Sequence, residues 1–376
     1  MNTELTILDR QLTLHRFPAN KNETLQAWDA GDEYLIHHLE EMALADNQHI
    51  LVLNDHFGAL SCWFSTRHRI TVMSDSFIAH QGILNNLKHN HCPEVTCLTT
   101  MDAIPDDVNI VIMQIPRNNR HLVWQLSQLR QQIPSHCQVI AVNKARDIHT
   151  STLALFERYL GQTHTSLAWK KHRLVFSQPD AAPVCVASEI EWSVDGEAIQ
   201  LHNLPNVYSG ESLDQGARFM LQHLPRDPKI QNIIDLGCGN GVLSVKLGQL
   251  NPEATLTCID ESYMAVASAQ KNLQVNLGND RQTHCLANNC LDGFDGANTD
   301  LVVCNPPFHQ QQAITDHIAW QMFCDAKHVL CKTGKLMVIG NRHLRYDVKL
   351  ARLFGKSHVK TVAGNKKFVI LEATKS

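Results

Sequence analysis

The stretch that decides the fold is Ile233-Ile234-Asp235-Leu236-Gly237-Cys238-Gly239-Asn240-Gly241. An apolar, β-branched run ends in an acidic residue, and a glycine-rich turn then leads into the amphipathic segment 242–250. This order predicts a buried strand, a tight loop and a helix. Glycine at positions 237, 239 and 241 lets the backbone approach a ligand where a Cβ would collide, so the stretch predicts a cradle for a nucleotide-type cofactor. Dinucleotide-binding folds carry a similar glycine pattern, and the cradle alone does not identify the cofactor.

A second motif, Asn305-Pro306-Pro307-Phe308, narrows the choice of cofactor. It lies about seventy residues further along and directly follows the apolar run 301–304. A nicotinamide dehydrogenase would explain the glycines but would leave this motif without a use. Together the two motifs predict a cradle for S-adenosylmethionine (SAM) that faces a pocket for a flat substrate bearing an amino group.

The residue types of this motif suit methyl transfer to an exocyclic amine. The side-chain oxygen of Asn305 and the carbonyl of Pro306 can accept both N–H bonds of one amino group and so aim its lone pair at the methyl. The fixed φ of Pro306 and Pro307 stiffens the loop that holds both acceptors. Phe308 offers a face on which a base can stack. We therefore predict catalytic roles for Asn305, Pro306, Pro307 and Phe308. The alternative is an ordinary strand-end turn.

Further polar residues are expected to hold the cofactor. Asp260 ends the strand after the cradle helix, where a carboxylate can accept hydrogen bonds from both ribose hydroxyls; its alternative role is to cap the helix that begins at 263. Asp235 is expected to order the glycine loop by accepting backbone N–H bonds. Asn289, or Asn288 in its place, can bond the adenine edge, although a plain turn asparagine explains it as well. The predicted cofactor-binding residues are Asp235, Gly237, Cys238, Gly239, Gly241, Asp260, Glu261, Asn288, Asn289 and Asn305.

Three short motifs occur twice in the same order, about 185 residues apart. They are Leu14-His15-x-x-Pro18 with Leu201-His202-x-x-Pro205, Asp29-x-Gly31 with Asp214-x-Gly216, and Gly58-x-Leu60-Ser61 with Gly241-x-Leu243-Ser244. The repetition indicates an internal duplication. In this register Asp235, Gly237 and Gly239 correspond to Val52, Asn54 and His56, so the first copy lacks the residues that would admit a cofactor. We expect the first copy to bind substrate or to support the second.

Short apolar runs alternate with helical patterns in both halves, which predicts parallel sheets with helical crossovers. The expected strands are 50–53, 70–73, 109–113 and 138–142 in the first half and 230–236, 255–259, 283–287, 300–304 and 335–339 in the second. Each half is expected to end in a hairpin, 167–177 and 358–371. The prediction is an α/β protein of two tandem Rossmann-like SAM-methyltransferase domains, 1–178 (degenerate) and 189–376 (catalytic), joined by a linker at 179–188.

Composition limits the class of protein. The chain has 376 residues, a net charge of −4, and 12 cysteines without a Cys-x-x-Cys pair. The 22 histidines form no His-Glu-x-x-His motif, so no metal is expected. Without a signal peptide or an apolar run near eighteen residues, the chain is predicted to be reduced and cytoplasmic, with no membrane partner; a monomer is favoured.

Basic residues gather near the C-terminus, where residues 326–376 hold twelve Lys or Arg but only two acids, Asp347 and Glu372. Basic residues beside aromatic ones suit a single-stranded segment or loop of RNA. The same charges would also be unremarkable on solvated helix and hairpin faces. The predicted RNA-binding residues are Lys170, Lys171, Arg173, Arg342, Arg345 and Lys349.

The duplicated plan, the cradle at 235–241, Asp260-Glu261-Ser262 and the motif at 305–309 resemble the ribosomal RNA guanine-N2 methyltransferases over essentially the whole chain. Residues 144–153 and Phe308-His309-Gln310-Gln311 look most similar to the large-subunit (23S) members, because small-subunit relatives usually carry Asp-Gly after that histidine. The resemblance implies SAM as cofactor, a guanine amino group held by Asn305 and Phe308, and an N-terminal half that helps to bind RNA. The guanine must then be unpaired or flipped out of its helix.

Other substrates use the same loop type. A 16S guanine, adenine N6, cytosine N4 and the glutamine amide of release factors are all planar amines or amides. A non-catalytic RNA-binding assembly factor with a relic cofactor site is the rival from another class.

Overall fold

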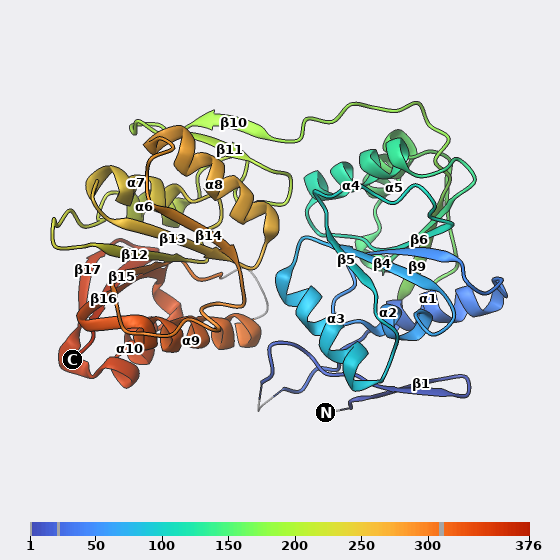
Figure 1. The fold of residues 1–376 in the computed structure, drawn as a ribbon, viewed down its shortest axis with the longest axis horizontal. Helices are drawn as coiled ribbons and strands as arrows, with labels where there is room; N and C mark the ends of the chain where they lie inside the picture. Colours follow the sequence, from blue (N-terminus) through green and yellow to red (C-terminus); the bar gives the residue numbers. More distant parts are fainter. Residues whose placement is uncertain (1, 21–22, 308–311) are drawn as a thin grey trace. The chain divides into compact units, whose positions relative to one another are not determined.

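A seven-stranded sheet forms the centre of each of two units in the computed structural model, which describes residues 2–20, 23–307 and 312–376 (Figure 1). The N-terminal unit comprises residues 1–188 and the C-terminal unit residues 189–376. Each unit begins with a two-stranded antiparallel hairpin and continues with alternating strands and helices.

The N-terminal unit opens with the hairpin β1 (Glu4–Ile7) and β2 (Arg10–Thr13). Its sheet strands are β3 (His49–Leu53), β4 (Arg69–Ser74), β5 (Thr96–Thr99), β6 (Ile110–Gln114), β7 (Gln138–Lys144), β8 (Thr163–Thr165) and β9 (His172–Ser177). Its helices are α1 (Ala30–Glu41), α2 (Ala59–Phe64), α3 (Phe77–His89), α4 (Asn119–Gln132) and α5 (Thr150–Tyr159), with a 3₁₀ turn η1 (Ala145–Asp147).

The C-terminal unit opens with the hairpin β10 (Ile190–Ser193) and β11 (Gln200–Asn203). Its sheet strands are β12 (Asn232–Leu236), β13 (Thr255–Asp260), β14 (Thr283–Ala287), β15 (Thr299–Cys304), β16 (Leu330–Asn341), β17 (Val359–Gly364) and β18 (Phe368–Thr374). Its helices are α6 (Gln215–Leu221), α7 (Val242–Leu250), α8 (Tyr263–Leu277), α9 (Gln312–Val329) and α10 (Tyr346–Phe354), with the 3₁₀ turns η2 (Arg342–Leu344) and η3 (Lys356–His358).

The two sheets have the same topology. The strand order is β5-β4-β3-β6-β7-β9-β8 in one and β14-β13-β12-β15-β16-β18-β17 in the other. In each sheet the first five strands run parallel, and the last hairpin adds two antiparallel strands. The prediction of two Rossmann-like α/β domains is therefore confirmed.

Each sheet is covered on both faces because its central strands are apolar on both sides. In β3, Ile50 and Val52 pack toward α1, α2 and α3, whereas Leu51 and Leu53 pack toward α4 and α5. In the C-terminal unit one core joins β12 to α6, α7 and α8, and the other joins it to α9 and α10. This three-layer arrangement leaves the carboxyl ends of the parallel strands as the place for a ligand site.

A buried asparagine makes the same three hydrogen bonds in each unit. Asn272 of α8 accepts from the N–H of His202 (2.8 Å) and donates to the carbonyls of His202 (3.1 Å) and Asn240 (2.8 Å). Asn86 of α3 accepts from the N–H of His15 (2.9 Å) and donates to the carbonyls of His15 (2.8 Å) and Phe57 (2.7 Å). Asn240 and Phe57 each precede the glycine that begins the next helix, so each asparagine fixes the loop after the first sheet strand.

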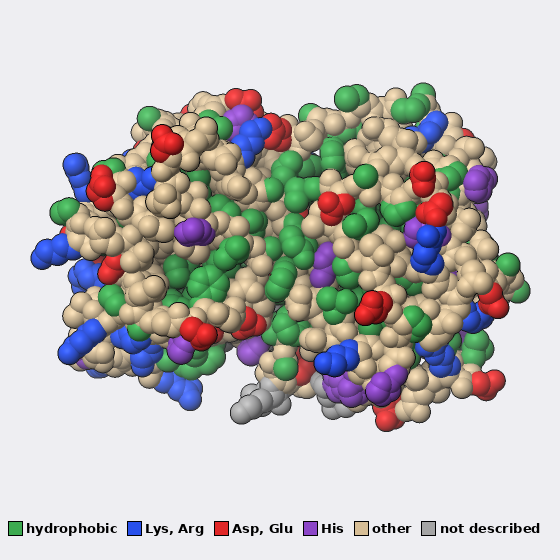
Figure 2. Space-filling view, viewed as in Figure 1, with side chains coloured by type: hydrophobic (Ala, Val, Ile, Leu, Met, Phe, Trp, Pro, Cys, Tyr) green, Lys and Arg blue, Asp and Glu red, His purple; other side chains and the backbone are tan. Residues whose placement is uncertain are grey.

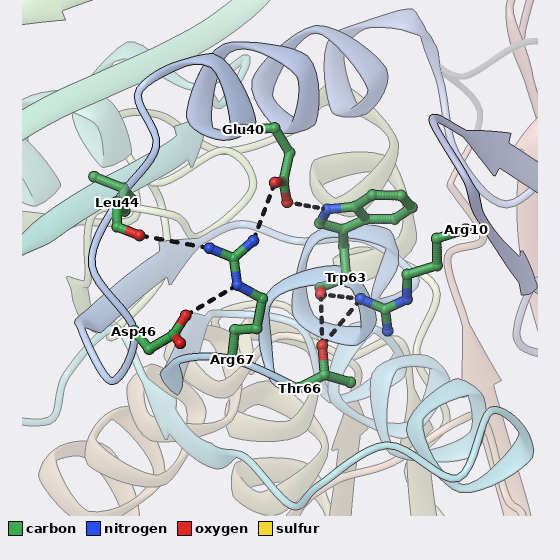
Figure 3. Close-up of polar contacts among 7 residues, drawn as sticks. All are labelled: Arg10, Glu40, Leu44, Asp46, Trp63, Thr66 and Arg67. Carbon is green, nitrogen blue, oxygen red and sulfur yellow. Dashed lines mark hydrogen bonds and ion pairs between the residues drawn. The ribbon is translucent and has the colours of Figure 1, made fainter.

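Two arginines tie α2 to its surroundings in the N-terminal unit (Figure 3). Arg10 of β2 donates to the carbonyl of Trp63 and to the hydroxyl of Thr66 (3.1 Å) near the end of this helix. The Trp63 indole donates to Glu40 (2.8 Å), whose other oxygen is 3.2 Å from Arg67. The helix end, where carbonyls lack intrahelical partners, is thus held by side chains from β2 and α1.

Sequence patterns located the long apolar strands but not the smaller elements. Every strand expected from an apolar run is present, with ends within a few residues, and both terminal hairpins form. The hairpins β1–β2 and β10–β11 and the short strand β5 were not expected. Within the segment expected as a linker, Ala181 and Val184 accept hydrogen bonds from Arg130 and Ser127, so this part of the segment is fastened to the N-terminal unit.

Substituting either buried asparagine should destabilise its own unit. Asn272→Ala leaves three buried backbone groups without their partner, and each such group costs about 1–3 kcal/mol. We expect the free energy of unfolding of the C-terminal unit to fall by roughly 2–4 kcal/mol. Hydrogen-exchange mass spectrometry should show faster exchange in peptides spanning 237–241.

The matched variant is Asn86→Ala, which should speed exchange in peptides spanning 54–58 and leave 237–241 protected. Unchanged exchange in both variants would show that the asparagines do not hold these loops.

Candidate cofactor and substrate site

The glycine loop after β12 has the backbone conformation that its glycines permit. Gly237, Gly239 and Gly241 have φ of 75°, 52° and 76°. A Cβ at Gly241 would lie 2.9 Å from the Cβ of Ala269, so this glycine lets α7 pack against α8. A Cβ at Gly239 would meet no atom within 4 Å, so the loop borders open space there. The loop therefore combines a packed side with a side that can receive a ligand.

The loop is held by the neighbouring strand. The N–H groups of Gly237 and Cys238 both donate to the carbonyl of Ile259, at 2.8 and 2.9 Å. One oxygen of Asp260 accepts from Gly239 N (2.9 Å) and the other from Ser262 N (3.0 Å). Ser262, not Asp260, caps α8, because its hydroxyl accepts from Ala265 N. The cap expected from Asp260-Glu261-Ser262 is therefore made by Ser262, and Asp260 is not the N-cap residue.

Asp260 keeps the capacity to bind a further donor. The two carboxylate oxygens have about four lone-pair sites in all, and three backbone N–H groups bond to them. Burial raises the pKa of Asp260, while the N–H groups of Ser262, Gly239 and Glu261 oppose that rise. The following residue, Glu261, is exposed. A hydroxyl group of a ligand matches the acceptor site that remains on this carboxylate.

Asp235 does not order the glycine loop in the way that the sequence suggested. The Asp235 side chain is buried and accepts from the hydroxyl of Ser244 (2.8 Å) in α7. The loop N–H groups bond Ile259 and Asp260 instead. Asp235 therefore acts on the loop through α7. Its burial, together with the nearby charge of Asp260, raises its pKa to about 7, although the hydrogen bonds from Ser244 oppose that rise.

Asn288 and Asn289 build the turn after β14. The Asn289 amide donates to the carboxylate of Asp292 (2.6 Å), and the Asn288 amide donates to the carbonyls of Asp292 (2.9 Å) and Cys290 (3.2 Å). The backbone N–H of Asn288 donates to the carbonyl of Asp260, which places the turn beside the glycine loop. Asp292, the partner that fixes both amides, was not predicted.

Asn305 at the end of β15 carries a buried acceptor. Its Nδ2 donates to Asp214 Oδ2 at 3.4 Å, while its Oδ1 is buried and accepts no hydrogen bond within the described part of the chain. Pro306 is buried and Pro307 is exposed; Phe308 lies outside the described residues. A buried acceptor without a donor costs about 1–3 kcal/mol, so its presence at a strand end indicates a place for a donor from a ligand.

In the N-terminal unit the side chains of the corresponding loop bond to neighbouring residues of that unit. Asn54 donates to the carbonyl of Gln114 (2.9 Å) and exchanges hydrogen bonds with the amide of Gln125. Asp55 accepts from Gly58 N and from both N–H and hydroxyl of Ser61. Asp55, which bonds Ser61, lies in the loop. In the C-terminal unit the carboxylate that bonds the corresponding Ser244 is Asp235, which lies in β12.

The predicted RNA-binding residues of the N-terminal unit lie on the turn before β9. Lys170 and Lys171 are exposed and have φ of 44° and 65°. Lys170 pairs with Glu33 and lies 4.5 Å from the centre of the Trp169 ring. Lys171 has no ion pair within the described residues, and Arg173 is partly buried. Lys171 is therefore the freest cation of this turn.

The predicted RNA-binding residues of the C-terminal unit contact neighbouring residues of that unit. Arg342 donates to the carbonyl of Asn365, Arg345 pairs with Asp347 (3.1 Å), and Lys349 lies 5.5 Å from the ring of Tyr346. Figure 2 nevertheless shows Lys and Arg side chains gathered over the part of this unit where β16, β17 and α10 lie. The surface is basic although these three cations are held by neighbours.

Two negative findings concern residues 2–20, 23–307 and 312–376. No group of three His, Cys, Asp or Glu residues there could hold a metal ion, and no helix there is long and apolar enough to cross a membrane.

The raised pKa of Asp235 predicts a pH-dependent stability. Between about pH 4, the pKa of an unfolded aspartate, and about pH 7, the folded protein binds a proton that the unfolded chain has released. The free energy of unfolding therefore falls as the pH rises through this window. Asp235→Asn removes the titration and can still accept from Ser244. We expect this variant to gain about 2–4 kcal/mol relative to the unmodified protein between pH 4.5 and pH 8, measured by denaturant unfolding at both pH values. An unchanged difference would show that Asp235 is ionised in the folded state at both pH values.

Two family models cover most of the chain. Residues 2–181 match the RLMG N-terminal domain, and residues 198–372 match the methyltransferase small domain. Among solved structures, the Thermus thermophilus 16S rRNA N2 G1207 methyltransferase (RsmC), in complex with AdoMet and guanosine, shares the fold with a TM-score of 0.79 at 19% identity, covering 100% of this chain and 98% of that one.

Curated relatives match over the full length. The ribosomal RNA large subunit methyltransferase G of Vibrio campbellii is 67% identical, covering 100% of this chain and 98% of the relative, and that of Vibrio cholerae is 66% identical over 100% of both. These matches confirm the resemblance, the enzyme class and SAM as the cofactor that the sequence predicted. The chain belongs to the ribosomal RNA large subunit methyltransferase G family.

Proposed function

We propose that the C-terminal unit transfers a methyl group from SAM to the exocyclic N2 amine of one guanine in 23S ribosomal RNA. The observation that carries the proposal is the buried acceptor of Asn305, which lies at the end of the strand next to the glycine-loop strand β12. An exocyclic amine brings the N–H donor that this oxygen lacks. Family membership supports ribosomal RNA as the molecule that carries the amine.

The residues of the cradle fit the cofactor. Gly239 opens onto free space, and Asp260 beside it retains acceptor capacity for ribose hydroxyls. Both asparagine amides of the 288–292 turn donate to protein groups, which leaves their side-chain oxygens as acceptors toward an adenine amine. Asp235 supports the cradle through Ser244. SAM, when bound, supplies an electrophilic methyl group on a sulfonium.

The Asn305 loop holds and orients the amine. The side-chain oxygen of Asn305 and the carbonyl of Pro306 accept its two N–H bonds, which draws the nitrogen lone pair out of conjugation. Two prolines restrict the loop, and the aromatic ring of Phe308 is proposed to stack on the base. Placing the amine in line with the methyl supplies the greater part of the rate, a term that can reach about 7–11 kcal/mol. The base must leave its helix, at a cost of a few kcal/mol.

The N-terminal domain, 1–178, is proposed to bind RNA or to support its twin without a cofactor of its own. Its glycine-loop positions carry Asn54 and Asp55, whose side chains bond to residues of the same unit, Asn54 to Gln114 and Gln125 and Asp55 to Gly58 and Ser61. The catalytic domain is 189–376, with 179–188 between them. We further propose that the protein acts in the cytoplasm as a monomer, where ribosomal RNA is available before assembly buries the target.

The proposal predicts the product and the effect of one substitution. With labelled SAM and deproteinised 23S RNA, nuclease digestion should release N2-methylguanosine; label in N6-methyladenosine or in protein would contradict it. Asn305→Ala removes the acceptor that holds the amine. We expect kcat to fall at least about 100-fold, as when one preorganised hydrogen bond is removed from an active site. The dissociation constant for SAM, measured by calorimetry, should change less than about twofold because the contact is made to substrate.

The control is Asp260→Asn, which should show the reverse pattern. It keeps only one of the two oxygens that accept from the backbone and loses the charge toward the ribose, so SAM should bind at least roughly tenfold more weakly while kcat at saturating SAM is maintained. Parallel loss of SAM binding and transfer in Asn305→Ala would contradict the role given to this residue.

Two adjacent lysines test whether the N-terminal turn binds RNA. Lys171→Gln should weaken RNA binding and reduce the slope of log affinity against log salt concentration by about 0.7–1, because one phosphate contact is lost. Lys170→Gln is the matched control at a similar backbone conformation, and its effect should be smaller because Glu33 already pairs with this ammonium group. Filter binding over a salt series measures both. Equal slopes in both variants and the unmodified protein would exclude this turn from the RNA interface.

A further inference from the structure

We propose that Asp214 is a positioning residue that fixes the orientation of the Asn305 amide and thereby makes its oxygen available to the substrate amine. This inference rests on the proposed function of Asn305. It adds a residue that touches neither the methyl donor nor the amine and acts through Asn305 alone.

Asp214 is built into the start of α6. As the N-cap residue, its Oδ2 accepts from the N–H of Ala217 at 2.9 Å. The same oxygen accepts from Asn305 Nδ2 at 3.4 Å, and Oδ1 accepts from the hydroxyl of Tyr208 at 3.4 Å. A Cβ at position 216 would lie 2.9 Å from Asp214 Oδ2, so Gly216 leaves room for the carboxylate in this position. The carboxylate is thereby held against the helix start and beside the end of β15.

A carboxylate selects one of the two orientations of an asparagine amide. A half-turn about the last side-chain bond of Asn305 exchanges its donor and acceptor with little change in shape. An ionised Asp214 can only accept, so it favours the orientation in which Nδ2 faces it and Oδ1 faces away. In the opposite orientation two oxygens would face each other, and the substrate amine would meet an N–H group. The contact with Asp214 thus accounts for the orientation in which the buried Oδ1 accepts from none of the residues that the structure describes.

The N-terminal unit shows that the cap does not require this contact. Asp29, which corresponds to Asp214, caps α1 by accepting from the N–H groups of Gly31 and Asp32. The amide at the end of the corresponding strand, that of Gln114, donates to Asp32 at 2.7 Å instead. Capping the helix and orienting the strand-end amide are therefore separate tasks, which Asp214 combines in the C-terminal unit.

The test uses a substitution that keeps the cap. Asparagine is as good an N-cap as aspartate, and its one oxygen can take the place of Oδ2, but without the charge, so Asp214→Asn keeps the cap and weakens the hydrogen bond that holds Asn305 in one orientation. We expect kcat for methylation of 23S RNA to fall about tenfold, with the dissociation constant for SAM and the melting temperature unchanged. Asp29→Asn, the same change at the cap of α1, should leave kcat unchanged.

A double-mutant cycle separates positioning from any other role. If Asp214 acts only through Asn305, Asp214→Asn should have no further effect in an Asn305→Ala background, measured under single-turnover conditions with labelled SAM. The same fold loss in both backgrounds, or an undiminished kcat in Asp214→Asn, would overturn the inference. Full activity of Asn305→Ala itself would instead contradict the proposed function, so the two failures are distinguishable.

Discussion

The carboxamide of Asn272 is the contact on which the candidate site depends. It forms hydrogen bonds with the N–H and carbonyl of His202 and with the carbonyl of Asn240. It thereby joins β11, α8 and the glycine loop. Because the side chain is fully buried, water cannot replace these hydrogen bonds. The loop that leaves space at Gly239 is therefore fixed from the side of α8, while Asp260 and Ile259 fix it from the sheet. A ligand meets a surface whose shape is set by buried protein contacts.

The N-terminal unit has the same asparagine contact but different residues in the loop that the asparagine holds. Asn86 makes the equivalent three hydrogen bonds, and Gly58, like Gly241, begins its helix with a positive φ. The residues before this glycine differ, since Asn54 bonds Gln114 and Gln125 and Asp55 bonds Gly58 and Ser61. The two units thus share the contact that sets the loop geometry although the residues of the loop differ.

The sequence predicted those features that one residue type determines by itself. Apolar runs located the parallel strands because both faces of such strands are buried, and the glycines at 237–241 indicated the loop because only glycine takes its conformations without strain. The sequence did not predict which of two similar residues makes a given hydrogen bond. The pattern could not tell that Asp235 bonds Ser244 while Asp260 takes the loop N–H, since both acids follow apolar strands. The hairpins β1–β2 and β10–β11 were missed because their strands are only partly buried and therefore contain no apolar run.

The fold that the two units share does not by itself leave the side-chain oxygen at this strand end without a hydrogen-bond donor. In the N-terminal unit the corresponding strand end is occupied from within, since the carbonyl of Gln114 accepts from Asn54 and its amide donates to Asp32. The C-terminal unit instead directs only the donor of Asn305 toward a carboxylate, and its buried oxygen accepts no hydrogen bond from residues 2–20, 23–307 and 312–376. Such an arrangement lowers stability, and a rigid surrounding framework is needed to keep the loop from collapsing onto the unsatisfied group. Pro306 and Pro307 restrict the backbone of this loop, and Asn272 fixes the glycine loop on the neighbouring strand, so the reactivity proposed for Asn305 depends on contacts made elsewhere in the unit.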